Sequence, residues 1–253
     1  MELTVFASGS SGNALLLSKG ESHIMIDAGI SMRRIQQALL QNGLDWRDIG
    51  GVLITHEHSD HICGLSTLVK RTSVPVFAPH TVANRLMGKL PALCGRIETI
   101  PVGCAFSLGG MRVRAFHTPH DTDESVGYRI EAGEVFAVST DMGCVTDEIR
   151  EGLLGADAVL IEANHDLQML RDGAYPFSLK RRILSDRGHL SNDDCALLAR
   201  QLADNGTRRI VLGHLSRENN RPELAMHTVS AALAGTTAAI YCAPADGPWR
   251  MPF

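Results

Sequence analysis

The sequence predicts a layered α/β fold, and three observations support this prediction. Short apolar, β-branched segments alternate with segments of helical periodicity along all 253 residues. Several apolar segments end directly in a metal-binding type of side chain: Asp27, His56, Asp141, His165 and His214. Side chains collected from many strand ends are typical of layered α/β folds. No repeat, low-complexity tract or proline-rich linker interrupts the chain, so we expect one domain over residues 1–253.

The expected elements follow from periodicity and from turn and capping residues. Strands are expected at 3–7, 14–18, 23–27, 51–54, 74–77, 97–100, 111–116, 126–130, 135–139, 158–161, 209–212 and 238–242. Helices are expected at 31–41, 65–71, 81–88, 146–154, around 180–182, 191–205 and 222–234. Ser31, Thr146 and Ser191 are suited to cap the helices that follow them. Asn42-Gly43 and Asn205-Gly206 are typical helix ends.

Composition and charge exclude some classes of protein. A net charge of −4 argues against a broad basic surface for nucleic acid, but it allows a local basic groove. Six cysteines without a CxxC pair indicate reduced thiols, and hence a cytoplasmic protein. The first residues do not resemble a signal peptide. No stretch approaches the roughly 18 apolar residues that a membrane span requires.

The segment 56–61, which reads HEHSDH, follows directly on the apolar run 51–55, which is expected to form a buried strand. Its imidazoles and carboxylates are the ligand types that hold Zn, Mn or Fe, so we expect a metal site there. The HExxH motif is excluded because Asp60 occupies the position of its second histidine. A similar loop, HTPHDTDES, spans residues 117–125 and offers both His117 and His120.

Two further strand ends have alternative interpretations. The loop 8–13 either presents backbone N–H groups and the Ser11 and Asn13 side chains to an anion, or it is a simple hairpin turn. Asp27 is either a turn residue or an acceptor that orients a ligand imidazole from outside the metal site.

The order of these motifs resembles that of the metallo-β-lactamase superfamily over the whole chain. The matching positions are Asp27, HxHxDH at 56–61, His120, Asp141 and His214. The resemblance implies a four-layer αββα sandwich. The chain is most similar to the YycJ/WalJ-like branch, in SGSSGN (8–13), THEHSDH (55–61), HDTDES and GY (120–128), STDMG (139–143), IEANHD (161–166), GHLSN (188–192) and GHLSREN (213–219). Members of that branch look like 5′→3′ DNA exonucleases, linked to cell-wall signalling and mutation avoidance in bacteria.

The resemblance implies two divalent metal ions per chain. His56, His58 and His120 would hold one of them. Asp60, His61 and His214 would hold the second, with Asp141 as the bridge. His120 is preferred to His117 because Pro-His-Asp matches the family position. Nitrogen and oxygen ligands fit Zn, Mn or Fe equally, so the sequence leaves the metal undecided. Two such ions about 3.5–4 Å apart lower the pKa of a shared water, which supplies hydroxide at neutral pH.

Further roles come from the same resemblance. His189 and His214 each lie in a Gly-His-Leu-Ser tetrapeptide, a feature similar to tRNase Z-like phosphodiesterases. We therefore expect His189 to act as general acid or to hold the scissile phosphate, and we place it with Asp60 among the catalytic residues. The expected substrate contacts are Ser11, Asn13, His189, Ser216 and Asn219. His165 is either a further ligand or substrate contact, or a structural hydrogen-bonding residue.

A cluster of cations occurs near these histidines in the sequence: Lys180, Arg181, Arg182, Arg187, Arg217 and Arg221. They either line a groove that follows phosphates or are ordinary surface charge. The stretch from Asp141 to His214 is filled by expected strands and helices, which leaves no room for an inserted β-CASP domain. No tRNA-clamping arm is visible. Substrate contacts must then come from short loops or from a partner subunit of a homo-oligomer.

The sequence therefore predicts a metal-dependent phosphodiesterase, with DNA processed from a 5′ end as the preferred substrate. One alternative is a PhnP-like hydrolase of small cyclic phosphodiesters or nucleotides, which the modest basicity favours slightly. A second alternative is thioester or lactam hydrolysis, which has no clear use for His189. A third is a metal-containing signalling module that binds a partner.

Overall fold

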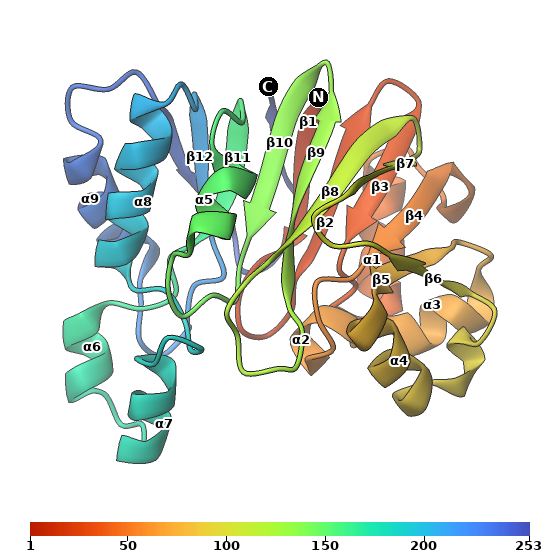
Figure 1. Cartoon of the computed structure of the whole chain (residues 1–253), viewed down its shortest axis with the longest axis horizontal. Helices are drawn as coiled ribbons and strands as arrows, with labels where there is room; N and C mark the ends of the chain where they lie inside the picture. The colour runs from red at the N-terminus through yellow and green to blue at the C-terminus, as the bar shows by residue number, and fades with distance from the viewer.

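Two seven-stranded sheets pack face to face in the computed structural model, which describes residues 1–253, and helices cover their outer faces (Figure 1). The first sheet contains β14 (Trp249–Pro252), β1 (Glu2–Ala7), β2 (Ala14–Lys19), β3 (Ser22–Ile26), β4 (Ile49–Leu53), β5 (Val76–Pro79) and β6 (Ile97–Ile100), in that order. The second contains β13 (Ala239–Cys242), β12 (Arg209–Gly213), β11 (Ala158–Glu162), β10 (Glu134–Ser139), β9 (Val126–Ala132), β8 (Met111–His117) and β7 (Ala105–Leu108). The expected four-layer αββα sandwich is confirmed.

The helices form the two outer layers. The first half of the chain contributes α1 (Met32–Gln41), α2 (Ser59–Ile62), α3 (Leu65–Arg71), α4 (His80–Lys89) and the 3₁₀ turns Trp46–Asp48 and Pro91–Leu93. The second half contributes α5 (Asp147–Leu153), α6 (Leu167–Asp172), α7 (Phe177–Ile183), α8 (Asn192–Asp204) and α9 (Pro222–Ala232). The side chains of Ser31, Thr146 and Ser191 accept backbone N–H groups at the starts of α1, α5 and α8, as expected.

Three apolar cores correspond to the layers. The core between the sheets includes Leu3, Val5 and Phe136. Phe6 belongs instead to the core beneath α1, α3 and α4, because alternate side chains of a strand point to opposite faces. A third core lies between the second sheet and helices α5, α8 and α9. Burial on both faces explains why these strands are almost continuously apolar.

Two strands and two helices were missing from the sequence-based prediction: β7, β14, α2 and α6. Both strands and α2 have only four residues, and α6 has six. β14 is paired antiparallel with β1, from the opposite end of the chain. Periodicity is weak in such short segments, and their pairing is decided by tertiary contacts.

The strands β3 to β6 run parallel to one another, as do β10 to β13. Their carboxyl ends therefore meet along one edge of the sandwich, at the bottom of Figure 1. The histidine- and aspartate-rich loops lie along this edge, and α6 and α7 extend beyond it. No helix combines the length and apolar character that crossing a membrane would need.

Candidate metal centre

The structure brings together all seven side chains that the resemblance assigned as ligands. Their nitrogen and oxygen atoms form overlapping groups whose members lie within 4.8 Å of one another: His56, His58 and His120; His56, His61 and Asp141; Asp60, His61 and His214. Contacts between these groups make one continuous cluster. The cluster draws on loops that are distant in sequence but adjacent at the strand ends.

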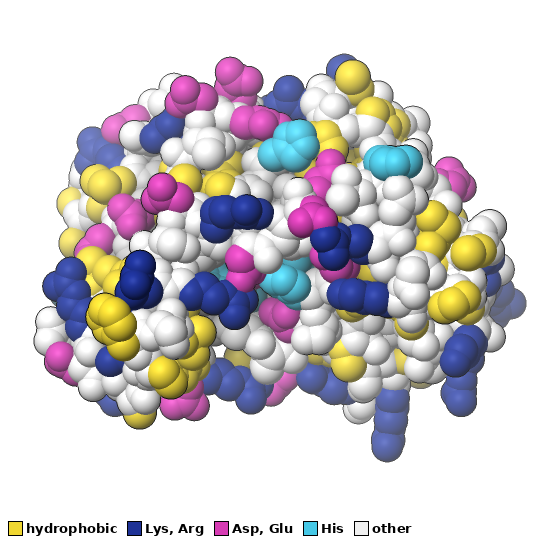
Figure 2. All heavy atoms as spheres, turned by 60° about the horizontal axis from the view of Figure 1, so that its bottom comes forward, with side chains coloured by type: hydrophobic (Ala, Val, Ile, Leu, Met, Phe, Trp, Pro, Cys, Tyr) yellow, Lys and Arg dark blue, Asp and Glu magenta, His cyan; other side chains and the backbone are white.

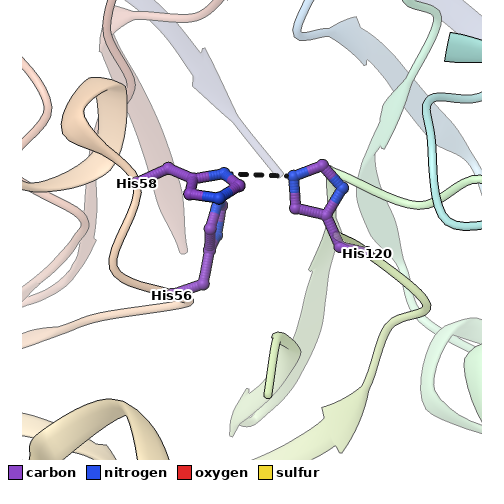
Figure 3. A group of neighbouring side chains, drawn as sticks. All are labelled: His56, His58 and His120. Atoms are coloured by element: carbon purple, nitrogen blue, oxygen red, sulfur yellow. Dashed lines mark hydrogen bonds between the residues drawn. The ribbon is translucent and has the colours of Figure 1, made fainter. Parts of the chain in front are cut away.

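The first group is made of three imidazoles that point toward one another (Figure 3). Nδ1 of His58 lies 3.2 Å from Nε2 of His120. His56 is completely buried, and its Nε2 has no hydrogen-bond partner. A buried polar atom without a partner is costly, so this nitrogen is well suited to a metal ion.

Asp141 lies between the two halves of the cluster. Its Oδ2 is 3.2 Å from Nε2 of His61, and its Oδ1 is 3.5 Å from His214 and 3.7 Å from His120. Asp60 completes the second half, with Oδ2 3.5 Å from the Nε2 atoms of His61 and His214. A carboxylate that faces both groups has the position of a bridging ligand.

The backbone is strained at three of these positions. Asp27, Asp141 and His214 have φ values of 61°, 56° and 54°, and they are the only non-glycine residues with positive φ. A left-handed conformation costs on the order of 1–3 kcal/mol per residue and occurs preferentially at functional sites. Here it turns the chain sharply just after β3, β10 and β12.

Asp27 supports the cluster from outside. Its Oδ2 lies 2.7 Å from Nδ1 of His61, and its Oδ1 accepts the Thr55 backbone N–H at 2.9 Å. The first contact fixes the ring orientation of His61 and leaves Nε2 to face the cluster. Carboxylates in this position commonly raise the basicity of metal-binding histidines.

Glu162 is a site residue that the sequence reasoning missed. It is completely buried at the end of β11, where Oε1 lies 2.7 Å from Nδ1 of His189 and 3.0 Å from Nδ1 of His214. Its Oε2 accepts the Met142 backbone N–H at 2.9 Å. The available signal was a charged residue at the end of an apolar strand, because a buried carboxylate requires partners.

The electrostatics of the cluster favour a bound cation. Burial, together with the neighbouring histidines, outweighs Asp141 and lowers the pKa of His56, which keeps the ring neutral. Burial also lowers the pKa of His214, but Asp141, Asp60 and Glu162 outweigh it and raise that pKa to about 10. The buried carboxylates thus favour positive charge close to them. Divalent ions bound between the rings can supply that charge. Neutral imidazoles, buried carboxylates and unpartnered acceptor atoms together fit a metal centre.

The candidate substrate contacts are only partly at the site. Asn13 is buried beside the cluster, with Nδ2 3.1 Å from Nε2 of His61, and Ser216 lines a cavity beside His189. Ser11 is exposed, and its neighbour Ser10 lines that cavity instead. Asn219 is buried away from the cavity, and its carbonyl accepts the Asp166 N–H at the start of α6. Direct substrate contacts at Ser11 and Asn219 stay predictions, and neither side chain lines this cavity.

The two histidines with open roles lie outside the ligand cluster. His117 is half exposed and contacts Glu148, with Nδ1 and Oε1 3.0 Å apart. His165 is buried, and neither ring nitrogen has a partner. Burial lowers the pKa of His165 to about 4, so its ring is neutral.

Cations surround the recessed histidines and carboxylates on this face of the molecule (Figure 2). Arg182 forms an ion pair with Asp121, and Arg187 donates to the carbonyls of His120 and Thr122. Lys180 donates to the carbonyl of Arg171. These three cations are therefore engaged with the protein, although the Arg182 side chain is still 59% exposed and lines the cavity beside His189. Arg217 makes only a 3.5 Å contact with Asp246.

The fold and the cluster define a metal-dependent hydrolase. The family model for the β-lactamase superfamily domain matches residues 22–215. The exodeoxyribonuclease YycJ of Bacillus anthracis is 39% identical over 92% of this chain and 89% of its own length. The exodeoxyribonuclease WalJ of Streptococcus pneumoniae is 37% identical over 91% of this chain and 87% of its own length. The chain therefore belongs to the β-lactamase superfamily, in the branch that contains YycJ and WalJ. Zn²⁺-bound PqqB from Methylobacterium extorquens has the same fold, with 22% identity, complete coverage of both chains and a TM-score of 0.77.

Proposed function

We propose that this protein is a two-metal phosphodiesterase that removes nucleotides from the 5′ end of DNA. His56, His58 and His120 would hold one divalent ion, and Asp60, His61 and His214 the other, with Asp141 between them. Zn, Mn and Fe all fit this donor set. The exodeoxyribonuclease names of two relatives that match most of the chain support DNA as substrate.

The observation that carries the proposal is the position of His189 beside the cluster. Glu162 occupies its Nδ1, so Nε2 is the nitrogen left for substrate. His189 lines a cavity next to His120, and 20% of its side chain is exposed. Burial lowers its pKa, but the carboxylates of Glu162 and Asp141 outweigh burial and raise it. A protonated imidazole in this place suits the protonation of a leaving oxygen.

Each group then has a defined task in phosphodiester hydrolysis. Metal ions, when bound, would supply a nucleophile at neutral pH and neutralise the charge that develops on the phosphoryl oxygens. The nucleophile forms a bond to phosphorus, and the bond from phosphorus to the 3′ oxygen of the terminal nucleotide breaks. His189 donates its Nε2 proton to that oxygen. Glu162 stabilises the protonated ring through Nδ1, and Asp27 holds His61 in place.

The test is a nuclease assay on protein reconstituted separately with Zn, Mn and Fe. Single- and double-stranded DNA, labelled at the 5′ or the 3′ end, is compared with bis-p-nitrophenyl phosphate. We expect the 5′ label to appear first as a mononucleotide. Early release of the 3′ label would reverse the proposed polarity. Hydrolysis of the small diester alone would favour the PhnP-like alternative, and no hydrolysis would favour a binding module.

A further inference from the structure

The cavity beside His189 has a second wall that the reaction described above does not use. It measures about 170 Å³ and lies between the strand-end loops and residues 175–183. Ser10, His189 and Ser216 line it from the strand-end loops. Tyr175 and Leu179 from the α6–α7 segment form the second wall, and the paired Arg182 and Asp121 also line the cavity. Figure 1 shows that α6 and α7 extend past the strand-end edge next to this site. We infer that this cavity binds the base of the 5′-terminal nucleotide, and that Tyr175 and Leu179 recognise it.

The size of the cavity favours one small group. Typical ligand pockets measure about 300–1,000 Å³, so about 170 Å³ suits a single ring system rather than a longer segment of strand. The lining combines two kinds of chemistry. Tyr175 and Leu179 offer an aromatic ring and an apolar surface, whereas the serines offer hydroxyl groups. Asn164 adds an amide, and the charges of Arg182 and Asp121 are paired with each other. A planar base with an apolar face and polar edges matches this combination.

The position of the cavity identifies which base would enter. The inference rests on the proposed function, in which His189 protonates the oxygen that leaves. The nucleotide carrying that oxygen must then lie on the His189 side of the scissile phosphate. For cleavage that releases the 3′ oxygen of a 5′-terminal nucleotide, this is the terminal nucleotide itself. A recess for one base at this place therefore favours a strand end over an internal site.

The segment that carries Tyr175 and Leu179 is fixed to the rest of the protein by contacts at both of its ends. Asp166 caps α6 through the Met169 N–H at 2.8 Å, and its own N–H is bonded to the Asn219 carbonyl. Beyond α7 the chain packs so closely on Gly143 that a Cβ there would lie 2.3 Å from the Asp186 carbonyl carbon. The pair between Arg182 and Asp121 ties α7 to the loop that carries His120.

The experiment compares two 5′-phosphorylated DNA strands, one with an intact terminal base and one with an abasic terminal residue. The measured quantity is the ratio of kcat/KM for the intact strand to kcat/KM for the abasic strand. We expect a ratio of about 10 or more for the wild type, from the strength of stacking on an aromatic ring. Tyr175→Ala and Leu179→Ala should bring the ratio toward 1. Both side chains are only partly buried, so the fold should survive, as thermal unfolding will check.

Phe177→Ala is the matched control. Phe177 lies on α7, as Leu179 does, but its side chain is 76% exposed and does not line the cavity. Its ratio should equal that of the wild type. Leu179→Trp, which fills the cavity, should slow the intact strand more than the abasic one. If DNA is degraded but the ratio is near 1, or is unchanged in both alanine variants, the base-binding inference is wrong while the proposed function stands. If the wild type degrades no DNA, the proposed function fails and the inference fails with it.

Discussion

Oε1 of Glu162 lies 2.7 Å from Nδ1 of His189. The same oxygen lies 3.0 Å from Nδ1 of His214, so one buried carboxylate orients a candidate metal ligand and the candidate general acid together. Their ring positions are therefore coupled. Changes at β11 should affect both metal binding and proton transfer.

Glu162→Gln keeps the size of the side chain but removes its charge. We expect metal affinity to fall about 10- to 100-fold, as is typical when the outer partner of a metal-binding histidine is lost. Competition with a chelator measures this. Glu148→Gln is the control, because Glu148 also contacts a histidine Nδ1, that of His117, outside the cluster. Equal metal affinity in both variants would contradict a role for Glu162 in positioning His214.

His189→Ala should separate proton transfer from metal binding. We expect kcat on DNA to fall about 10²- to 10⁴-fold, the usual contribution of a general acid. Metal content should stay near two ions per chain, as measured by elemental analysis. His117→Ala should change neither quantity, because that ring is 53% exposed and pairs with Glu148. A loss of metal from His189→Ala would make His189 a ligand instead.

Gly29→Ala should disturb Asp60 through the backbone. A Cβ at Gly29 would lie 1.6 Å from the Asp60 carbonyl oxygen, so one of the two segments must move. We expect a loss of about 1–3 kcal/mol in the free energy of unfolding, together with lower metal occupancy. Gly88→Ala on α4 is the control, since nothing lies within 4 Å of its Cβ position and alanine favours helix. Denaturant unfolding measures the free energy of unfolding, and elemental analysis measures the metal occupancy. Wild-type values of both quantities in Gly29→Ala would disprove the expectation.

Of the three cations on α7, Lys180 donates to a backbone carbonyl and Arg182 pairs with Asp121, whereas Arg181 makes neither kind of contact. Its guanidinium lies 6.0 Å from the centre of the Phe177 ring. If it contacts a phosphate, Arg181→Ala should weaken DNA binding and reduce the slope of log K against log salt by about 0.7 for a single strand. Bis-p-nitrophenyl phosphate should be affected less. Arg47→Ala is the control. The Arg47 side chain is 90% exposed and precedes β4, whereas the metal-binding loop follows the other end of β4. An unchanged salt slope would rule out this contact.

Lys19 and Glu134 join the two sheets at the surface, with Nζ and Oε2 2.7 Å apart. Hydrogen bonds from Lys19 and from the Met1 amino group, 2.6 Å from the same oxygen, lower the pKa of Glu134 from 4.5 to about 2. These contacts therefore stabilise the fold above pH 4.5, and their contribution is lost as pH falls from 4.5 toward 2. Glu134→Gln should lower Tm slightly at pH 7, and its difference from the wild type should shrink at pH 3. A constant difference across this range would contradict the assignment.

Much of the metal site could be predicted from the sequence, because ligands at strand ends occur as short local motifs. His56, His58, Asp60 and His61 fall within six residues, and parallel strands bring the other loops to the same edge. Glu162 escaped prediction because its partners, His189 and His214, come from two distant loops. Sequence alone also does not show which of several adjacent polar side chains points inward: Ser10 lines the cavity beside His189, whereas its neighbour Ser11 does not.

The sequence by itself determined a layered α/β fold and a metal site at residues 56–61, since apolar periodicity and ligand spacing are local properties of the chain. The αββα class and the seven candidate ligands followed from the resemblance of its motifs to those of the superfamily. The tertiary structure decided which carboxylates support which imidazoles, since these pairs join residues far apart in the chain. It also decided how the cations near α7 are used: Arg182 and Arg187 bind the loop that carries His120. The cavity between Tyr175 and His189 joins the α6–α7 segment to strand-end loops from distant parts of the chain. These pairs and contacts depend on burial and on charge compensation between packed loops. No single segment of the sequence specifies either of them.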